Sequence, residues 1–383
     1  MILIKNAHVV DAATHTDEVC CVLIKDGKIV AMETMIDEKQ YANIRVIDAG
    51  GHYVLPGLVD VHVHFRDPGF LYKEDILTGA RAAAAGGVTS VVLMANTRPV
   101  VDDVGTLRYV LEKGKKTDIH VHSCASITRD LKGKQLTDMA LLQQAGAAGF
   151  TDDGVPILDA GLLREAMQEA ARLGAVLSLH EEDPAYITNN GIDAGSIAAA
   201  HYGIRGSDRQ AEIRMIDRDL ELALETGAVL NIQHISTREG VELVRQAKKN
   251  GKNIHAEATP HHFTLTQEAV IRYGTLAKMN PPLRTSEDRE AIIEGLRDGT
   301  IDLIATDHAP HSKAEKAGPI TLAPSGIIGL ETALPLAVTN LVREGRLTMQ
   351  QLVERMCLAP AQLYGLDAGR IYVGKEADLV ILN

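Results

Sequence analysis

The chain has 383 residues, more than the roughly 250–300 at which a single hydrophobic core usually stops growing, so one large and one smaller domain are expected. Its formal charge is −12 at pH 7, aromatic residues make up only 3%, and Trp is absent, which argues against a basic groove with stacking platforms for nucleic acid. No apolar run of about 18 residues and no signal-type N-terminus occur, so we predict a cytoplasmic enzyme without membrane spans.

Residues 1 to about 52 are predicted to form a small β unit. Short apolar segments alternate with turn residues there, and Asp26-Gly27 is a typical hairpin turn. The expected strands are Ile2–Ile4, Val19–Lys25, Lys28–Met32 and Arg45–Asp48.

From Tyr53 to about Asn340, apolar strands alternate with amphipathic helices. The expected strands are 53–64, 89–95, 118–125, 147–151, 175–180, 229–235, 253–259 and 301–306. Helices are expected at 75–85, 136–145, 160–173, 209–225 and 238–249, most of them followed by Gly. Eight such repeats predict an α/β fold, a (β/α)8 TIM-like barrel over residues 53–366. The sequence contains no Gly-rich phosphate loop, which an open doubly wound sheet would more often show.

The C-terminal segment returns to a strand pattern. Thr348–Leu366 is expected to be helical, and residues 370–373 and 377–382 are expected to be strands. We predict that residues 367–383 join residues 1–52 in one composite β domain, which would bring the two chain ends together.

Metal-binding side chains follow nearly every predicted barrel strand, where the active residues of such barrels lie. His62 and His64 are two residues apart in a strand, so their imidazoles point to the same face. The other candidates at strand ends are Asp152, Asp153, His180, His234, His261, His262, Asp307 and His308. Each alone could be a capping residue or a histidine bonded to the backbone. Together on one rim, they predict a centre of two metals that makes a nucleophilic hydroxide at neutral pH.

Five motifs give the chain a specific resemblance. They are DVHVHFRDPG (60–69), MANTRP (94–99), FTDDG (150–154), KMNPPLR (278–284) and ATDHAPH (305–311). With these motifs the sequence resembles the type I dihydroorotases of the amidohydrolase superfamily, from the first strands through the final Ala-Asp-Leu-Val-Ile segment.

The resemblance implies two Zn²⁺ ions in one centre. One ion would be held by His62, His64 and Asp307, and the other by His180 and His234, with Asp153 as the bridge. Asp153 is preferred to Asp152 because its spacing before His180 matches the bacterial type I pattern. Many relatives, hydantoinases included, use a carboxylated Lys as the bridge, whereas the motif at 150–154 offers only carboxylates.

The resemblance also implies a substrate site beside the metals. Arg66, Asn96 and His311 would hold a substrate carboxylate, and Asn280 would bond the substrate ring. Residues 312–326 would form a mobile lid that offers backbone N–H groups near Pro324, Ser325 and Gly326. Without the metal cluster, the residues alone favour Arg66 as an exposed loop charge and Asn96 and Asn280 as turn residues. For residues 312–326, the sequence alone fits a surface loop and a lid equally well.

The implied activity is the reversible conversion of 4,5-dihydroorotate and N-carbamoyl-L-aspartate in de novo pyrimidine (UMP) biosynthesis. A zinc-activated hydroxide would attack the ring carbonyl, with Asp307 as general base and then general acid. One alternative is a hydantoinase, dihydropyrimidinase or allantoinase, whose substrates lack the α-carboxylate that Arg66 would bind. Another is a catalytically silent scaffold for aspartate transcarbamoylase.

Two protein partners are considered, aspartate transcarbamoylase and a second copy of the chain. Relatives of this type continue for several tens of residues past an Ala-Asp-Leu segment like the one near residue 377, whereas the sequence stops at Asn383. A shortened small sheet would expose an edge that another subunit covers.

Overall fold

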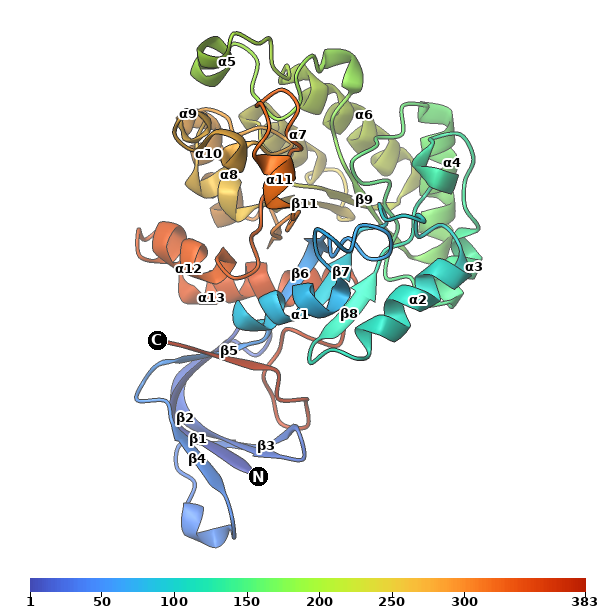
Figure 1. The fold of residues 1–383 in the computed structure, drawn as a ribbon. Helices are drawn as coiled ribbons and strands as arrows, with labels where there is room; N and C mark the ends of the chain where they lie inside the picture. Colours follow the sequence, from blue (N-terminus) through green and yellow to red (C-terminus); the bar gives the residue numbers. More distant parts are fainter.

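Seven parallel strands and one short bridging segment form a closed ring in the computed structural model, which describes residues 1–383 (Figure 1). The strands are β6 (Leu58–Val63), β7 (Val88–Leu93), β8 (His120–Ser123), β9 (Val176–Leu179), β10 (Val229–Ile232), β11 (Ile254–Ala258) and β12 (Leu303–Ile304). They pair in parallel as β6-β7-β8 and as β9-β10-β11-β12. Bridges at Phe150 and between Val63 and His308 join these two runs into a barrel.

The predicted strand 147–151 is the irregular member of the ring. Phe150 bridges to Ala125 on one side and Leu177 on the other, but no regular strand extends from it. The reason lies in the next residues: the Asp152 carboxylate accepts hydrogen bonds from the backbone N–H groups of Ile127 and Thr128, at 2.8 and 3.0 Å, which turns the segment toward that loop.

A side chain helps to close the seam between the first and last barrel strands. The buried Asp60 carboxylate accepts the backbone N–H of Thr306 at 3.1 Å and that of His62 at 3.2 Å. The backbone N–H of His64 donates to the carbonyl of His308 at 2.8 Å. Burial raises the pKa of Asp60 to about 6, although these hydrogen bonds act in the opposite direction.

Helices cover the outside of the barrel and cap its ends. Those following the strands are α1 (Ile76–Ala85), α2 (Val104–Gly114), α3 (Met139–Gln144), α4 (Ala160–Leu173), α6 (Gln210–Thr226), α7 (Arg238–Ala247), α10 (Ser286–Asp298) and α12 (Ala333–Ala337). Shorter ones in the loops are α5 (Ile197–Tyr202), α8 (Pro260–Thr264), α9 (Glu268–Tyr273) and α11 (Lys313–Lys316). The last are α13 (Met349–Val353) and α14 (Ala359–Leu363), with π-helical turns at Val338–Val342 and Glu354–Leu358.

Helix α4 shows how the local sequence fixes these elements. Asp159 accepts hydrogen bonds from the N–H groups of Gly161 and Leu162 and so caps the N-terminus. The buried residues recur at helical spacing and pack on the strands: Leu163, Ala166, Met167 and Ala170. Gly174, with φ of 64°, ends the helix in the left-handed conformation.

Both ends of the chain contribute to a smaller sheet beside the barrel (Figure 1). Its strands are β1 (Ile2–Asp11), β2 (Thr16–Lys25), β3 (Lys28–Glu33), β4 (Arg45–Asp48), β5 (Tyr53–Pro56) and β13 (Leu379–Leu382). The order is β13-β5-β1-β2-β3, and β4 pairs with the first residues of β1. Its own core contains Ile4, Val22, Ile29, Val54 and Ile371.

The structure divides the predicted strand 53–64 at Gly57. Residues before the division form β5 of the small sheet, and those after it form β6 of the barrel. Any side chain at this position would collide with Thr89, whose Oγ1 would lie 2.1 Å from a Cβ. The Gly57 N–H donates to the carbonyl of Asp378 at 2.8 Å, so the crossing point also ties down the C-terminal segment.

One expectation for the C-terminal segment is corrected, and the expected helix is confirmed over residues 349–363. Residues 370–373 are not a strand, because the Ile371 N–H donates to the Asp11 carboxylate at 2.6 Å instead of to a neighbouring strand. The expected helix 348–366 consists of α13, a π-helical turn and α14. No helix in the structure is both long and apolar enough to cross a lipid bilayer.

Candidate metal centre and active site

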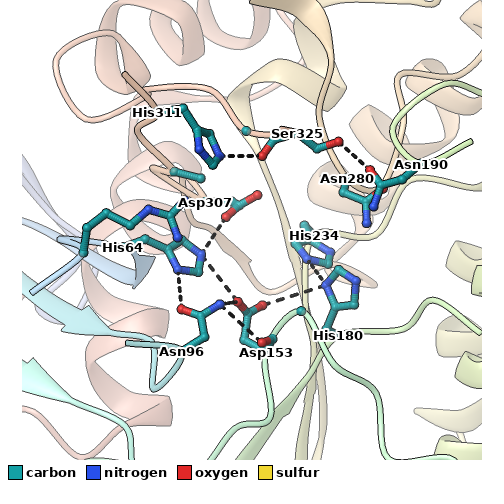
Figure 2. Close-up of a pocket in the computed structure, with 14 residues that line it drawn as sticks. His64, Asn96, Asp153, His180, Asn190, His234, Asn280, Asp307, His311 and Ser325 are labelled. Atoms are coloured by element: carbon teal, nitrogen blue, oxygen red, sulfur yellow. Dashed lines mark hydrogen bonds and ion pairs between the residues drawn. The ribbon is translucent and has the colours of Figure 1, made fainter. Parts of the chain in front are cut away.

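A polar cavity of about 250 Å³ opens where the barrel strands end (Figure 2). Its walls come from the ends of β6, β9 and β10 and from the loops that follow the other strands. The lining residues are His64, Arg66, Asn96, Asp153, Gly154, His180, Asn190, His234, Asn280, Asp307, Ala309, His311, Ser325 and Gly326.

Two groups of potential metal ligands share one carboxylate. The first is His62, His64 and Asp153, the second is Asp153, His180 and His234, and the ligand atoms within each group lie within 4.8 Å of one another. Asp153 Oδ1 is 3.4 Å from His62 Nε2 and 3.8 Å from His180 Nδ1. Asp153 therefore faces both groups at once, whereas the neighbouring Asp152 is bonded to the loop at 127–128.

Asp307 lies beside the first group. Its Oδ1 is 3.0 Å from His64 Nε2 and 3.5 Å from His62 Nε2, while its Oδ2 has no hydrogen-bond partner in the protein. Figure 2 shows this carboxylate between the His64 side of the cavity and the open space. The residue has φ of 47°, a left-handed backbone that a non-glycine residue adopts only when its surroundings hold it there.

The charges in this cluster support one another. Burial raises the pKa of Asp153, but the close approach of His62 and the charges of His64, His62 and His180 outweigh burial and keep the pKa well below the ordinary value. Burial and the charges of His180 and His62 hold the pKa of His234 well below its ordinary value. An ionised Asp153 and a neutral His234 are the forms that bind a cation.

The residues present fit a divalent metal ion. His62 Nε2 is buried without a hydrogen-bond partner, and His180 Nδ1 and His234 Nε2 face each other at 2.9 Å. Imidazole nitrogens and carboxylate oxygens in such a cluster are the donors that zinc and similar divalent metals take. All six residues are at most 7% exposed: His62, His64, Asp153, His180, His234 and Asp307.

Arg66 brings a partly buried positive charge to the cavity. Its Nε donates to the carbonyl of Pro310 at 3.2 Å, and neither terminal nitrogen has a hydrogen-bond or ion-pair partner in the protein. Burial lowers the pKa of Arg66, although the nearby charges of Asp307 and Asp153 raise it. An anionic ligand would relieve this desolvation and could use both terminal nitrogens.

The loop after β12 packs over the cavity. His311 Nε2 lies 2.8 Å from the carbonyl of Ser325, and His311 Nδ1 lies 3.0 Å from Lys73 Nζ. Lys73 also forms an ion pair with Glu315 at 3.0 Å, at the side of α11. Burial and the charges of Arg66 and Lys73 lower the pKa of His311 to about 4, so its ring is neutral at pH 7.

Comparison with known proteins gives the family of the chain. The family model described as "Amidohydrolase family" matches residues 53–383. A dihydroorotase from Clostridioides difficile (strain 630) is 53% identical over 383 residues, covering 100% of this chain and 90% of the relative. A dihydroorotase from Lactococcus lactis subsp. lactis is 48% identical over 382 residues, covering 100% of this chain and 89% of the relative. The chain belongs to the amidohydrolase family.

Solved structures agree on the fold of this amidohydrolase. An L-hydantoinase (dihydropyrimidinase) from Arthrobacter aurescens superposes with a TM-score of 0.89 at 30% identity, covering 100% of this chain and 86% of that one. A D-hydantoinase (dihydropyrimidinase) from Thermus sp. gives 0.85 at 24% identity, with the same coverage. The expected α/β barrel fold with a sheet from both chain ends is thus confirmed.

The amidohydrolase cavity gathers most of the residues predicted for substrate contact. Arg66, Asn96, Asn280 and His311 line it, and Asn280 Oδ1 is buried without a partner. Both polar side-chain atoms of Asn96 also contact potential metal ligands. Its Oδ1 lies 2.9 Å from His64 Nδ1, and its Nδ2 donates to Asp153 Oδ2 at 2.7 Å. Any anion bound by Asn96 would compete with Asp153 for the same amide group.

The three predicted lid residues are placed differently from one another. Ser325 and Gly326 line the cavity, whereas Pro324 does not and its carbonyl accepts a hydrogen bond from Lys316 at 3.0 Å. The Gly326 N–H already donates to the carbonyl of Lys278 at 3.0 Å, and Pro324 has no N–H. Of these three residues, only Ser325 keeps a backbone donor without a protein partner.

Sequence reasoning missed two polar residues of this amidohydrolase site. Asn190, on the loop after β9, accepts a hydrogen bond from Ser325 Oγ at 2.5 Å, and its only signal was the turn-like Asn189-Asn190-Gly191. Glu257, a fully buried carboxylate in β11, lies 2.5 Å from His62 Nδ1. A charged residue between Ala256 and Ala258 in a predicted barrel strand was the available signal.

Proposed function

We propose that this amidohydrolase is a dihydroorotase, which interconverts 4,5-dihydroorotate and N-carbamoyl-L-aspartate in pyrimidine biosynthesis. The observation that carries the proposal is the partly buried Arg66, with two terminal nitrogens free of protein partners, in the same cavity as the two groups of ligands that share Asp153. Both substrates carry a carboxylate beside the amide bond that forms or breaks. The relatives named dihydroorotase match the whole length of the chain.

Arg66 selects the carboxylate. A guanidinium matches a carboxylate with two parallel hydrogen bonds, and burial strengthens each of them. Hydantoin-type substrates have no such group, so they would leave the Arg66 charge unpaired in the partly buried wall of the cavity. This cost is the physical basis for preferring dihydroorotate.

Two zinc ions are proposed for the ligand cluster. His62, His64 and Asp307 would hold one and His180 and His234 the other, with Asp153 between them, as the grouping around Asp153 supports. Metal ions bound there would lower the pKa of a water molecule and polarise the scissile carbonyl.

Asp307 moves the proton in this scheme. As the water oxygen forms a bond to the ring carbonyl carbon, the free Oδ2 of Asp307 accepts a proton from that water. Asp307 then delivers the proton to the ring nitrogen when the carbon–nitrogen bond breaks, which leaves a neutral carbamoyl amide and a carboxyl group. The second proton of the water passes from this carboxyl group to solvent, which gives the carboxylate. The same steps in reverse close the ring.

Other side chains hold the ring in place. The unpartnered Oδ1 of Asn280 accepts a hydrogen bond from a ring N–H, and the backbone N–H of Ser325 donates to the ligand from the loop side. His311 keeps this loop over the cavity through the carbonyl of Ser325.

The free edge of strand β13 offers a surface for a partner protein. Strand β13 pairs only with β5 and leaves Ile381 42% exposed, so this edge suits a second copy of the chain or aspartate transcarbamoylase. Size measurement of the isolated chain, alone and with aspartate transcarbamoylase, tests both.

The test of function pairs an activity assay with metal analysis. The isolated chain should hydrolyse dihydroorotate, prefer it clearly over hydantoin and contain zinc. Asp307→Asn should abolish turnover while leaving dihydroorotate binding largely intact. Preference for hydantoin, or normal turnover by Asp307→Asn, contradicts the proposal.

A further inference from the structure

Glu257 occupies a position in the barrel where an apolar side chain would be ordinary. It lies in β11, is completely buried, and its only ion-pair partner is His62. Burying a carboxylate without a Lys or Arg beside it costs free energy, so we expect Glu257 to have a role beyond packing.

One oxygen of Glu257 contacts both halves of the ligand cluster. Glu257 Oε1 lies 2.5 Å from His62 Nδ1 and accepts the backbone N–H of His234 at 3.2 Å. These two histidines belong to the two different groups that share Asp153. A single carboxylate oxygen thus touches a ligand residue of each group.

The contact with His62 fixes which ring nitrogen is free. Because Glu257 accepts the proton on Nδ1, Nε2 is the His62 nitrogen that is left to bind a cation, and this atom is buried, without a hydrogen-bond partner and 3.4 Å from Asp153. A carboxylate behind a histidine in this way also makes the ring a better electron-pair donor. His64 has the neutral amide of Asn96 in the corresponding place.

The contact with His234 supports a strained backbone. His234 has φ of 28°, a conformation that a non-glycine residue keeps only when neighbouring groups hold it. The bond from its N–H to Glu257 is one such restraint. The second oxygen of Glu257 is itself held by Asn231 Nδ2 at 2.9 Å, and the same Nδ2 donates to Ser178 Oγ at 2.9 Å.

We propose that Glu257 is a positioning residue for the metal centre, setting the tautomer of His62 and the backbone of His234 together. The inference rests on the proposed function, because it assumes that the cluster binds metal. Glu257 does not line the cavity, so it acts through the two histidines.

Three variants test this role. Glu257→Gln keeps the shape but removes the charge behind His62. Combining Glu257→Gln with Asn231→Asp restores the net charge and moves the carboxylate away from His62. The amide introduced at position 257 would donate to the carboxylate introduced at position 231, and the hydroxyl of Ser178 would donate to that carboxylate as well. Glu212→Gln is the matched control, because Glu212 is equally buried and bonds Ser236, Thr237 and no residue of the cluster.

The readouts are zinc affinity, from competition with a chromophoric chelator, and unfolding of the metal-free protein. Glu257→Gln should bind zinc about 10–100-fold more weakly. The double variant should recover the stability that the metal-free Glu257→Gln protein loses, but it should not recover zinc affinity. Glu212→Gln should lower the stability of the metal-free protein and leave zinc affinity unchanged. The visible spectrum of the cobalt-loaded protein should change only in the two variants at position 257.

Two results would overturn the inference while leaving the proposed function in place. One is zinc affinity in Glu257→Gln equal to that of the unmodified chain. The other is recovery of affinity together with stability in the double variant, which would make the residue merely structural. Failure of the unmodified chain to bind zinc would remove both proposals together.

Discussion

The cavity has a metal half and a substrate half, and different parts of the fold position their side chains. The metal half consists of side chains at strand ends and in the first turns after them, and its six residues are at most 7% exposed. The substrate half consists of partly exposed side chains on loops, among them Arg66 and His311. The barrel itself shapes the first half, whereas contacts between loops shape the second. Metal binding and substrate recognition should therefore respond separately to mutation.

The largest effect is expected from removing the residue that the two ligand groups share. Asp153→Ala deletes the proposed bridge and should lower both zinc content and kcat, the latter by about 10³-fold or more, since metal chemistry contributes several kcal/mol. Metal analysis and turnover of dihydroorotate check this. Asp152→Asn is the control and should lose stability without losing metal, because Asp152 bonds the loop at 127–128. Full zinc content in Asp153→Ala would contradict the grouping.

A smaller but more selective effect is expected in the substrate half. Arg66→Met should lower kcat/KM for dihydroorotate by roughly 100-fold, because about 3 kcal/mol of charged hydrogen bonding is lost. Zinc content should stay unchanged. Any slow turnover of hydantoin should not fall, since that substrate has no carboxylate for Arg66. Equal losses on both substrates would show that Arg66 supports the fold and not recognition.

The contact between the two loops should matter less. Lys73→Met breaks the ion pair with Glu315 and the contact with His311, and it should raise KM a few-fold, in line with about 1 kcal/mol for a partly exposed pair. Combining it with Glu315→Gln in a double-mutant cycle should give less than the sum of the single effects. Additive effects, or loss of zinc in Lys73→Met, would contradict a role confined to the loop.

The smallest expected effect is a pH dependence of loop order. Burial and the charge of Lys278 lower the pKa of Lys316 to about 8, below its ordinary value of 10.5. The ordered loop therefore binds fewer protons than a detached loop, so its order should increase as pH rises from about 8 to 10.5. Hydrogen exchange of residues 312–326, corrected for intrinsic rates, measures this. Lys316→Met should remove the dependence, and an unchanged pH profile in that variant would contradict it.

Local patterns in the sequence were enough to predict elements with local causes. Helix 160–173 and strand 45–48 were predicted with the bounds that the structure shows, because caps and periodicity lie within the element itself. The division of strand 53–64 could not be predicted this way. It depends on Thr89 and Asp378, which are distant in sequence and meet Gly57 only in the folded chain.

The candidate site shows the same limit. The spacing of His62 and His64 and the acidic motif at 150–154 pointed to a metal centre, and the structure brings these residues together. The hydrogen bond from the Asn96 amide to Asp153 and the contact of Glu257 with His62 could not be predicted from the sequence. Hydrogen-bond partners across a barrel leave no periodic trace in sequence, because each pair joins residues from separate strands.

The seam closed by Asp60 has a consequence for how the protein is made. Its hydrogen bond to Thr306 joins residues 246 positions apart, and the ligand cluster has a similar span, from His62 and His64 to Asp307. During synthesis the early ligands leave the ribosome long before Asp307 exists, and closing so large a loop is a late step in folding. A nascent or truncated chain thus cannot assemble the full ligand set, and a complete metal load marks a finished barrel.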